Sequence, residues 1–312
     1  MADEKVEYAN PTIEVHAKNV QNPSHMEWTD KGRLIVSSHS SGSVFDVTDG
    51  GDMSDATPFA EGLGGPASIL PLDADRLLIS ESQNGQVMNI AGGGKYSDKD
   101  PFASGLSRPY SLGRTVDQDG NLRVVATEKR PTIGGSLEAF VTDITGGGED
   151  HDTLVSGIPT HASPTGPKPD GADWDWDKPR EAGFTPDCNS WASFDVDTDR
   201  LFLSISPLGE IMEISDAEGT TYQDLIHDKG RVIARGLNHT GGLKYNSHDG
   251  LLYGVEPYVG SIFAVDPEDS SLEAQRVVSG LDKPGCLRFG PENEMYVCGR
   301  GQNVIFEITD YK

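Results

Sequence analysis

A short phrase recurs along the chain: glycine or asparagine, an aliphatic residue, two variable residues and a proline. Its aliphatic positions are 20, 63, 106, 158, 237 and 281, which gives spacings of 43, 43, 52, 79 and 44 residues. A repeat of about 40–50 residues is typical of one blade of a β-propeller. The copies at Gly157 and Gly236 lack the proline, and the complete copies are Asn19–Pro23, Gly62–Pro66, Gly105–Pro109 and Gly280–Pro284.

Each phrase is followed by short runs of alternating apolar and polar residues, separated by turns rich in Gly, Asp, Asn and Ser. In the first unit these runs are 25–28, 33–37 and 43–47, and a fourth run such as 274–278 precedes a following phrase. Period-2 alternation between such turns is a strand signal. The sequence therefore predicts an all-β fold, a six-bladed β-propeller in which residues 1–312 form a single domain.

The two ends of the chain complement each other. The sixth unit ends after its third run, 303–308, so its outer strand is missing. A β-rich segment, Thr12 to His16, precedes the first phrase and can supply that strand. We expect this N-terminal strand to close the last blade, because closure removes an exposed sheet edge.

The charge balance limits the partners. The chain has 25 Lys and Arg against 50 Asp and Glu, a net charge of −25, which repels nucleic acid and anionic membranes. No segment approaches the ~20 apolar residues that span a bilayer. We therefore expect a small-molecule substrate, no nucleic-acid or membrane partner, and a monomer. The start lacks the features of a signal peptide, so we expect a cytoplasmic protein if Met1 is the native start, and otherwise a secreted or periplasmic one.

Cysteines are too few for a disulfide framework. Cys286 and Cys298 flank the turn at 291–293, so a simple hairpin would place them opposite each other. Such a pair can form a bridge in an oxidising compartment, or it can remain two buried free thiols. Cys188 has no partner under either interpretation.

Propeller geometry predicts where the site lies. The first strand of each blade runs inward from one face and the second returns to it, so both strand ends and the blade connections share one mouth of the channel. Ligand sites favour such concave places. The predicted catalytic residues at this mouth are His25, His39, Glu81, Glu128, His239, Glu256 and Arg300.

Two kinds of chemistry fit these side chains. Histidine and carboxylate can hold one divalent ion (Ca, Mg, Mn or Zn), with His25, His39, Glu81 and Glu256 as ligands. The same groups could act as general acid and base, with Arg300 binding an anionic group. Each glutamate taken alone also fits a structural role, in which it accepts backbone N–H bonds. No nucleotide cofactor is expected, because G-x-G-x-x-G and P-loop motifs are absent, and a G-x-S-x-G elbow is absent too.

The longest insertion, residues 159–187, joins the third blade to the fourth and carries Trp174 and Trp176. Long loops without secondary structure are often functional lids. We interpret it as a lid over an apolar or cyclic ligand; the alternative is a loop folded back on the fourth blade. The predicted substrate-binding residues are Tyr110, His161, Trp174, Trp176, Asn189, Trp191 and Tyr258.

The whole chain resembles the NHL-repeat and gluconolactonase-like six-bladed propellers, the superfamily of regucalcin, strictosidine synthase-like proteins and phosphotriesterases. The stretches 252–256 and 109–122 also look like virginiamycin B lyase repeats. The resemblance implies hydrolase, lyase or cyclase chemistry on a small molecule at the channel mouth. A non-catalytic propeller that binds a ligand or a protein is the alternative function.

The calcium ligands of the gluconolactonase-like proteins are not kept. Their metal-binding glutamate corresponds to Ser24, four residues before Trp28. Their third-blade Pro-Asn-Gly is replaced by Pro109-Tyr110-Ser111, and their late Asp-Gly corresponds to Gly241-Gly242. An enzyme with this sequence would use a constellation of its own.

Overall fold

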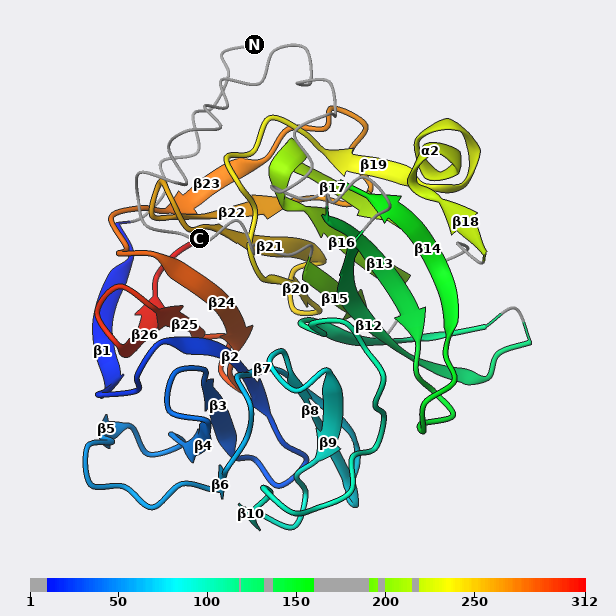
Figure 1. Cartoon of the computed structure of the whole chain (residues 1–312). Helices are drawn as coiled ribbons and strands as arrows, with labels where there is room; N and C mark the ends of the chain where they lie inside the picture. The colour runs from blue at the N-terminus through cyan, green and yellow to red at the C-terminus, as the bar shows by residue number, and fades with distance from the viewer. Residues whose placement is uncertain (1–9, 118, 132–136, 160–190, 196–199, 215–218) are drawn as a thin grey trace.

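The structure is a computed structural model that describes residues 10–117, 119–131, 137–159, 191–195, 200–214 and 219–312. Within these residues the strands form six sheets. Figure 1 shows them in a ring, with first strands such as β2, β7 and β20 toward the middle. The fold is a six-bladed β-propeller, as the repeat predicted.

The first three blades follow the repeated order of strands from the inside outward. Blade 1 consists of β2 (Pro23–Trp28), β3 (Leu34–Ser38), β4 (Ser43–Asp46), β6 (Ala60–Glu61) and β10 (Gly94–Lys95). Blade 2 consists of β7 (Pro66–Asp73), β8 (Arg76–Glu81) and β9 (Gln86–Asn89). Blade 3 consists of β11 (Leu112–Val116), β12 (Leu122–Pro131), β13 (Leu137–Asp143), β14 (Asp152–Ile158) and β18 (Thr220–Thr221).

The last three blades keep this order, and the N-terminal strands join the sixth. Blade 4 consists of β15 (Trp191–Asp195), β16 (Arg200–Ile205), β17 (Glu210–Glu213) and β19 (Arg231–Ala234). Blade 5 consists of β20 (Leu243–Asn246), β21 (Leu251–Glu256), β22 (Ser261–Val265) and β23 (Gln275–Val278). Blade 6 consists of β24 (Pro284–Phe289), β25 (Met295–Gly299), β26 (Val304–Thr309), β1 (Thr12–Lys18) and β5 (Gly51–Asp52).

Among the described residues, helix is confined to short turns near blade 4. These are η1 (Ser206–Leu208), α2 (Tyr222–Asp224) and η2 (Leu225–Lys229). Thr221 caps α2 through a capping box with Asp224. Within the described ranges, no helix is long and apolar enough to cross a membrane.

The ring closes as the ends of the sequence predicted. Strand β1 pairs antiparallel with β26, from Thr12 opposite Thr309 to Lys18 opposite Val304. The outer strand of the last blade is therefore supplied by the N-terminal part of the chain, and the edge of β26 is covered.

The core consists of layers between adjacent blades. One cluster joins Met26 and Val36 of blade 1 to Ile305 of blade 6, and other clusters fill each remaining junction around the ring. Each sheet is packed on both faces, so middle strands of the blades such as β3, β22 and β25 are buried at every position.

The recurring phrase is explained by a backbone contact between blades. The phrase leucines Leu63 and Leu281 donate their N–H groups to the turn glycines Gly42 and Gly260, each at 3.0 Å. These glycines have φ of +66° and +69°, and an added Cβ would lie 2.6 and 2.1 Å from the leucine carbonyl oxygens. The turn therefore needs glycine both for its conformation and for the close approach.

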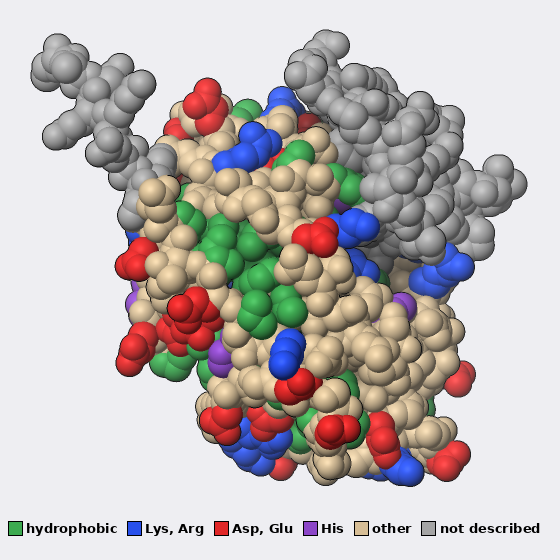
Figure 2. Space-filling model, turned by 90° about the vertical axis from the view of Figure 1, so that its left-hand side faces the viewer, with side chains coloured by type: hydrophobic (Ala, Val, Ile, Leu, Met, Phe, Trp, Pro, Cys, Tyr) green, Lys and Arg blue, Asp and Glu red, His purple; other side chains and the backbone are tan. Residues whose placement is uncertain are grey.

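The surface reflects the charge of the sequence. Figure 2 shows acidic side chains spread over the side of the molecule that carries β1, around a group of hydrophobic side chains. Among the exposed apolar residues of β1 are Ile13 and Val15.

Candidate functional site

The first and second strands of a blade pair so that the start of one lies beside the end of the other. The pairs at this end include Pro23–Ser38, Pro66–Glu81 and Pro284–Gly299. We call this end of the channel the mouth. The phrases that connect the blades lie at the same end.

Three residues that directly follow second strands have matching backbone positions at the mouth. The N–H groups of His39, Ser82 and Arg300 each donate to the carbonyl of the residue that precedes a phrase proline. The acceptors are Asn22, Gly65 and Lys283, at 3.1–3.2 Å. Because these residues belong to blades 1, 2 and 6, which are neighbours in the ring, they form one continuous part of the rim.

His39 is held in one orientation on this rim. Its Nε2 lies 3.1 Å from the Ser82 hydroxyl, which itself donates to the Gly65 carbonyl at 3.0 Å. The hydroxyl therefore accepts from Nε2, and the neutral ring keeps Nδ1 as its acceptor. Burial, and then the charge of Arg300, lower the pKa of His39 below its ordinary value, so the ring is neutral at pH 7. Arg300 is positioned by Asn22, whose Oδ1 accepts its Nε–H at 3.0 Å.

The predicted glutamates bind the connections between blades. Glu81 Oε1 accepts the N–H of Gly64 at 2.5 Å, and Glu128 Oε2 accepts that of Ser107 at 2.7 Å. Gly64 and Ser107 both occupy the third position of the phrase. The remaining bonds of Glu81 are to Asn84 and Gln86, and those of Glu128 are to Arg130 and Thr142.

Glu256 has the same role in blade 5 and is fully buried. Its Oε1 accepts the N–H of Asn238 at 2.7 Å, again the third position of a phrase. Ser261 donates to Oε2 at 2.7 Å, and Arg276 donates to both oxygens at 2.6 and 2.9 Å. The three glutamates therefore accept backbone N–H bonds, which is the structural alternative raised by the sequence.

The predicted metal-ligand set is not assembled. Glu81 and Glu256 each bind the connection of their own blade, and His25 and His39 have different partners. Among the described residues, no group of three or more His, Cys, Asp or Glu side chains could hold a metal ion. The two histidines contact neighbouring blades instead, His39 at Ser82 and His25 at Ile69 and Arg288, so metal binding by these four residues stays a prediction.

His239 and Tyr258 form an aromatic pair in blade 5. Their ring centroids lie 4.4 Å apart, and the planes are tilted by 58°. His239 is 2% exposed and has φ of +51°. The predicted catalytic histidine and the predicted substrate-binding tyrosine are thus in contact with each other.

Tyr110 reaches from blade 3 to blade 1. Its hydroxyl lies 3.0 Å from Ser24 Oγ, and its ring packs on the cluster formed by blades 1 and 6. Its carbonyl accepts hydrogen bonds from Ser68 N–H and Ser80 Oγ in blade 2. Ser24 lies at the mouth end of β2 and Tyr110 just precedes β11, so this contact lies at the mouth.

His25 lies deeper in the channel and is 4% exposed. The Ile69 N–H group points at its Nδ1 over 3.1 Å, and Arg288 Nη2 lies 2.5 Å from its Nε2. Burial, and then the charges of Arg288 and Lys244, lower the pKa of His25 well below its ordinary value. The His25 ring is therefore neutral. It lies in the interior of the channel, whereas His39 lies on the rim.

A charged cluster beside His25 was missed by the sequence analysis. Arg288 Nε lies 2.6 Å from Glu27 Oε2, and Lys244 Nζ lies 3.7 Å from the same oxygen. These residues belong to the inner strands β24, β2 and β20 of three adjacent blades. We call this group, together with Arg114 of β11, the bore cluster.

One sequence signal could have revealed this cluster. Each of its three contacting members stands between two hydrophobic residues at the same position of an inner strand: Met26-Glu27-Trp28, Leu243-Lys244-Tyr245 and Leu287-Arg288-Phe289. A charged side chain at that position of a buried strand is costly to desolvate, so it indicates a partner of opposite charge across the channel.

Other predicted residues cannot be placed. His161, Trp174, Trp176 and Asn189 lie outside the described residues, as does nearly all of the predicted lid. Trp191 begins β15, and only its backbone is described.

The two blade-6 cysteines do lie together, as the hairpin predicted. Their Sγ atoms are 3.0 Å apart, both residues are buried, and both are free thiols. Of the two alternatives left open by the sequence, the structure contains the thiol pair.

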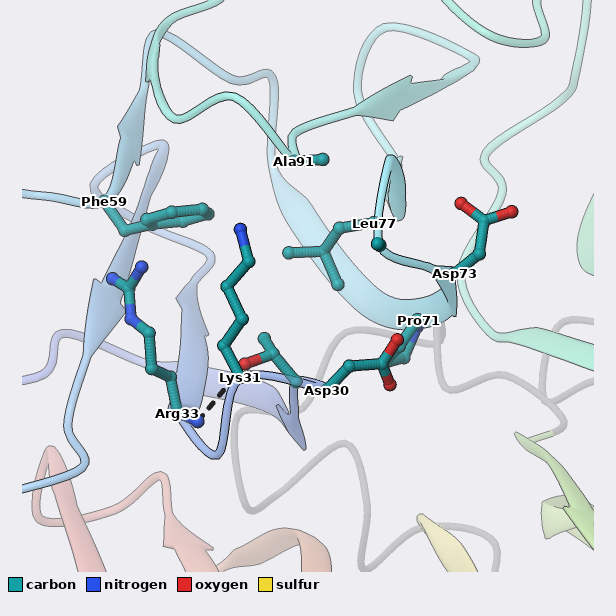
Figure 3. Close-up of a pocket in the computed structure, with 10 residues that line it drawn as sticks. Asp30, Lys31, Arg33, Phe59, Pro71, Asp73, Leu77 and Ala91 are labelled. Atoms are coloured by element: carbon teal, nitrogen blue, oxygen red, sulfur yellow. Dashed lines mark hydrogen bonds between the residues drawn. The ribbon is translucent and has the colours of Figure 1, made fainter.

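Two hollows lie outside the channel cluster. Figure 3 shows one of about 430 Å³ between blades 1 and 2, where the Arg33 side chain lies over Phe59 and is paired with Asp46. A second hollow, of about 1060 Å³, lies beside Asn22 and Ser38 at the mouth and is lined mainly by Asn and Ser. The first hollow is lined by Asp30, Lys31 and Asp73 as well as Arg33, and the second is lined by uncharged residues.

Comparison with known proteins identifies the architecture. No family model matches the chain, and no curated protein matches it. Similar solved structures include a virginiamycin B lyase from Staphylococcus aureus (12% identity, TM-score 0.54, covering 96% of this chain and 99% of that one) and a luciferin-regenerating enzyme (11%, 0.61, 96% and 95%). An auxiliary nutrient binding protein from Bacteroides thetaiotaomicron VPI-5482 is also similar (10%, 0.62, 99% and 78%).

The likeness is one of fold. At about 10% identity these six-bladed propellers include both enzymes and binding proteins, so the chemistry of this chain rests on its own residues. Membership of the NHL-repeat or gluconolactonase-like family stays a prediction.

Proposed function

We propose that this propeller is a small-molecule enzyme that acts at the mouth, with His39 as the general base and Arg300 as the binding group for a substrate anion. The observation that carries the proposal is the fixed geometry of His39. Its Nε2 is held by Ser82 and its pKa is lowered, so Nδ1 can take a proton at neutral pH.

The chemistry follows from these two side chains. Nδ1 removes a proton from a substrate carbon or from a water molecule, and the imidazolium later returns that proton to the leaving group. The Arg300 guanidinium stabilises negative charge on the substrate during the transfer. Such a pair suits hydrolase, lyase or cyclase reactions, and the aromatic rings of Tyr110 and Tyr258 would contact an apolar or cyclic part of the substrate.

A substrate panel tests this function. The panel consists of lactones that carry a separate carboxylate and of unsaturated acids, and each member is paired with the amide of its carboxylate. Each compound is incubated with the protein, and products are followed by mass spectrometry. We expect turnover of carboxylate members and a loss of about 100-fold or more in His39→Gln, because general-base catalysis contributes about 10²–10⁴-fold. The exposed His248 provides a matched control, and His248→Gln should retain full activity.

The Arg300 role has its own readout. Arg300→Met should raise KM for carboxylates more than for amides, and it should move the acidic limb of the pH profile upward because His39 loses a neighbouring positive charge. Turnover that is unchanged in His39→Gln would contradict the proposal.

A non-catalytic binding propeller is the second candidate. It is favoured by the use of Glu81, Glu128 and Glu256 as backbone acceptors, which removes three carboxylates from acid–base work. Calorimetric binding of a panel member without product formation, weakened in Arg300→Met, would support this candidate over the enzyme.

A further inference from the structure

The two groups of the proposed site come from blades that meet where the ring closes. His39 follows β3 of blade 1, and Arg300 follows β25 of blade 6. The phrase between β1 and β2 crosses this junction, and its Asn22 contacts both groups. The Asn22 carbonyl accepts the His39 N–H at 3.2 Å, and its Oδ1 accepts the Arg300 Nε–H at 3.0 Å. One residue thus joins the histidine and the arginine of the site.

The backbone of Asn22 does what the fold requires at this position of each complete phrase. The residue that precedes a phrase proline has a positive φ in every case: +49° at Asn22, +64° at Gly65, +49° at Arg108 and +50° at Lys283. The carbonyls of Gly65 and Lys283 also accept N–H bonds from the rim, at 3.1 and 3.2 Å. Left-handed backbone favours glycine and asparagine, yet arginine and lysine occupy this position as well. The fold therefore needs this backbone conformation and does not need an amide side chain here.

The Asn22 amide makes contacts beyond this backbone role. Its Nδ2 donates to Ser40 Oγ at 3.3 Å, which directs Oδ1 toward Arg300. The Asn22 N–H donates to Asn303 Oδ1 at 2.8 Å, so the residue is held from the rim turns of blades 1 and 6. The amide is uncharged, so its bond orients the guanidinium without cancelling the positive charge.

We propose that Asn22 is the positioning residue of the mouth, which fixes the Arg300 guanidinium relative to His39. An arginine side chain loses rotamer freedom when it binds a ligand, and that cost is lower when the side chain is already held in place. Groups that are held in one geometry also act more effectively on a bound molecule. The benefit of this placement rests on the proposed function, whereas the placement itself can be measured without a substrate.

Nuclear magnetic resonance measures the placement through the Arg300 Nε–H signal, which is assigned by its absence from the spectrum of Arg300→Met. The test variant is Asn22→Gly, because glycine keeps the left-handed backbone and both backbone hydrogen bonds while it removes the amide. Asn19→Gly is the matched control: Asn19 has φ of +63°, and its Nδ2 donates to Asp52 at 2.7 Å. Loss of the Asn22 bond should speed hydrogen exchange of the Arg300 Nε–H by about 10-fold, and Asn19→Gly should not change it.

Thermal-shift measurement with benzoate and benzamide tests the consequence for anion binding. Benzoate should raise the melting temperature of the wild type more than benzamide does. This preference should fall in Asn22→Gly toward the value of Arg300→Met, and it should be kept in Asn19→Gly. The variant Asn22→Asp separates orientation from charge, since its carboxylate still accepts the Nε–H. Exchange should stay slow in Asn22→Asp, but the added negative charge should remove the preference for benzoate.

The outcomes separate the positioning role from the proposed function. Equal exchange rates of the Arg300 Nε–H in wild type and Asn22→Gly would overturn the proposal. A preference for benzoate that is unchanged in Asn22→Gly would overturn it as well. Faster exchange in Asn22→Gly, together with a wild type that does not prefer benzoate, would confirm the placement and contradict the proposed role of Arg300 instead.

Discussion

The hydroxyl of Tyr110 lies 3.0 Å from the Ser24 hydroxyl, so a side chain of blade 3 is joined to the inner strand of blade 1. The contact lies at the mouth, as do His39, Ser82 and Arg300. His25 and Glu27 lie farther along β2, and Arg288 lies farther along β24.

Removing the Tyr110 hydroxyl should have a small effect on folding. Tyr110→Phe and Ser24→Ala each delete one side of the same bond, so each should lower the free energy of unfolding by about 0.5–1.5 kcal/mol. Their effects should not add in the double variant, because the second change removes nothing further. Urea unfolding of the three variants measures this, and additive losses would show that the contact is not formed.

Glu256 should be far more important for stability than for ligand binding. Glu256→Ala leaves the Asn238 N–H and the Ser261 hydroxyl without their acceptor inside the protein. We expect a loss of about 2–4 kcal/mol in the free energy of unfolding.

The same variant distinguishes the structural role from a catalytic one. At a temperature where Glu256→Ala is folded, its affinity for mouth ligands should equal that of the wild type. A large loss of affinity with unchanged stability would restore Glu256 to the functional site.

The propeller could be predicted because its phrase encodes contacts between blades. Leu63 packs in a core layer while its N–H donates to the carbonyl of the turn glycine of the preceding blade. The apolar position and the glycine therefore both recur at the spacing of one blade. Closure by β1 could be predicted from the missing strand of the last unit. Such patterns depend on the backbone and on apolar periodicity, which sequence records directly.

The site was harder to predict because sequence places a residue along a strand without giving the direction of its side chain. Glu81 and Glu256 end their second strands as expected, yet each carboxylate turns to a phrase N–H that lacks another acceptor. The bore cluster was missed for a related reason: Glu27 and Arg288 are 261 residues apart, and only the ring brings their strands together.

Acidification should destabilise the protein through His25. Its pKa is lowered in the folded state, so between that value and the unfolded value of about 6.5 the unfolded chain binds more protons. This contribution is fully present above about pH 6.5 and is lost progressively as the pH falls below it.

Urea unfolding at several pH values from about 7.5 to 5.5 checks this expectation. His25→Gln should reduce the pH dependence of the free energy of unfolding in that interval. Part of the dependence should remain, because the pKa of His39 is also lowered. An identical slope in wild type and His25→Gln would show that the ring is accessible to protons in the folded state.

The thiol pair in blade 6 predicts selective oxidation. Because the Sγ atoms of Cys286 and Cys298 lie 3.0 Å apart, an oxidant that reaches them should join these two cysteines to each other. Peptide mapping after treatment with oxidised glutathione measures the linkage. Cys298→Ser should abolish it, and recovery of all three cysteines as free thiols from the treated wild type would contradict the expectation.

The central claim is that the mouth of this acidic propeller holds the anionic group of a small molecule on Arg300. Thermal-shift measurement with matched pairs of carboxylic acids and their amides tests it most directly, in wild type and Arg300→Met. The account predicts that acids raise the melting temperature of the wild type more than amides do, and that Arg300→Met loses most of this preference. Equal effects of acids and amides on the wild type, or a preference unchanged in Arg300→Met, would contradict it.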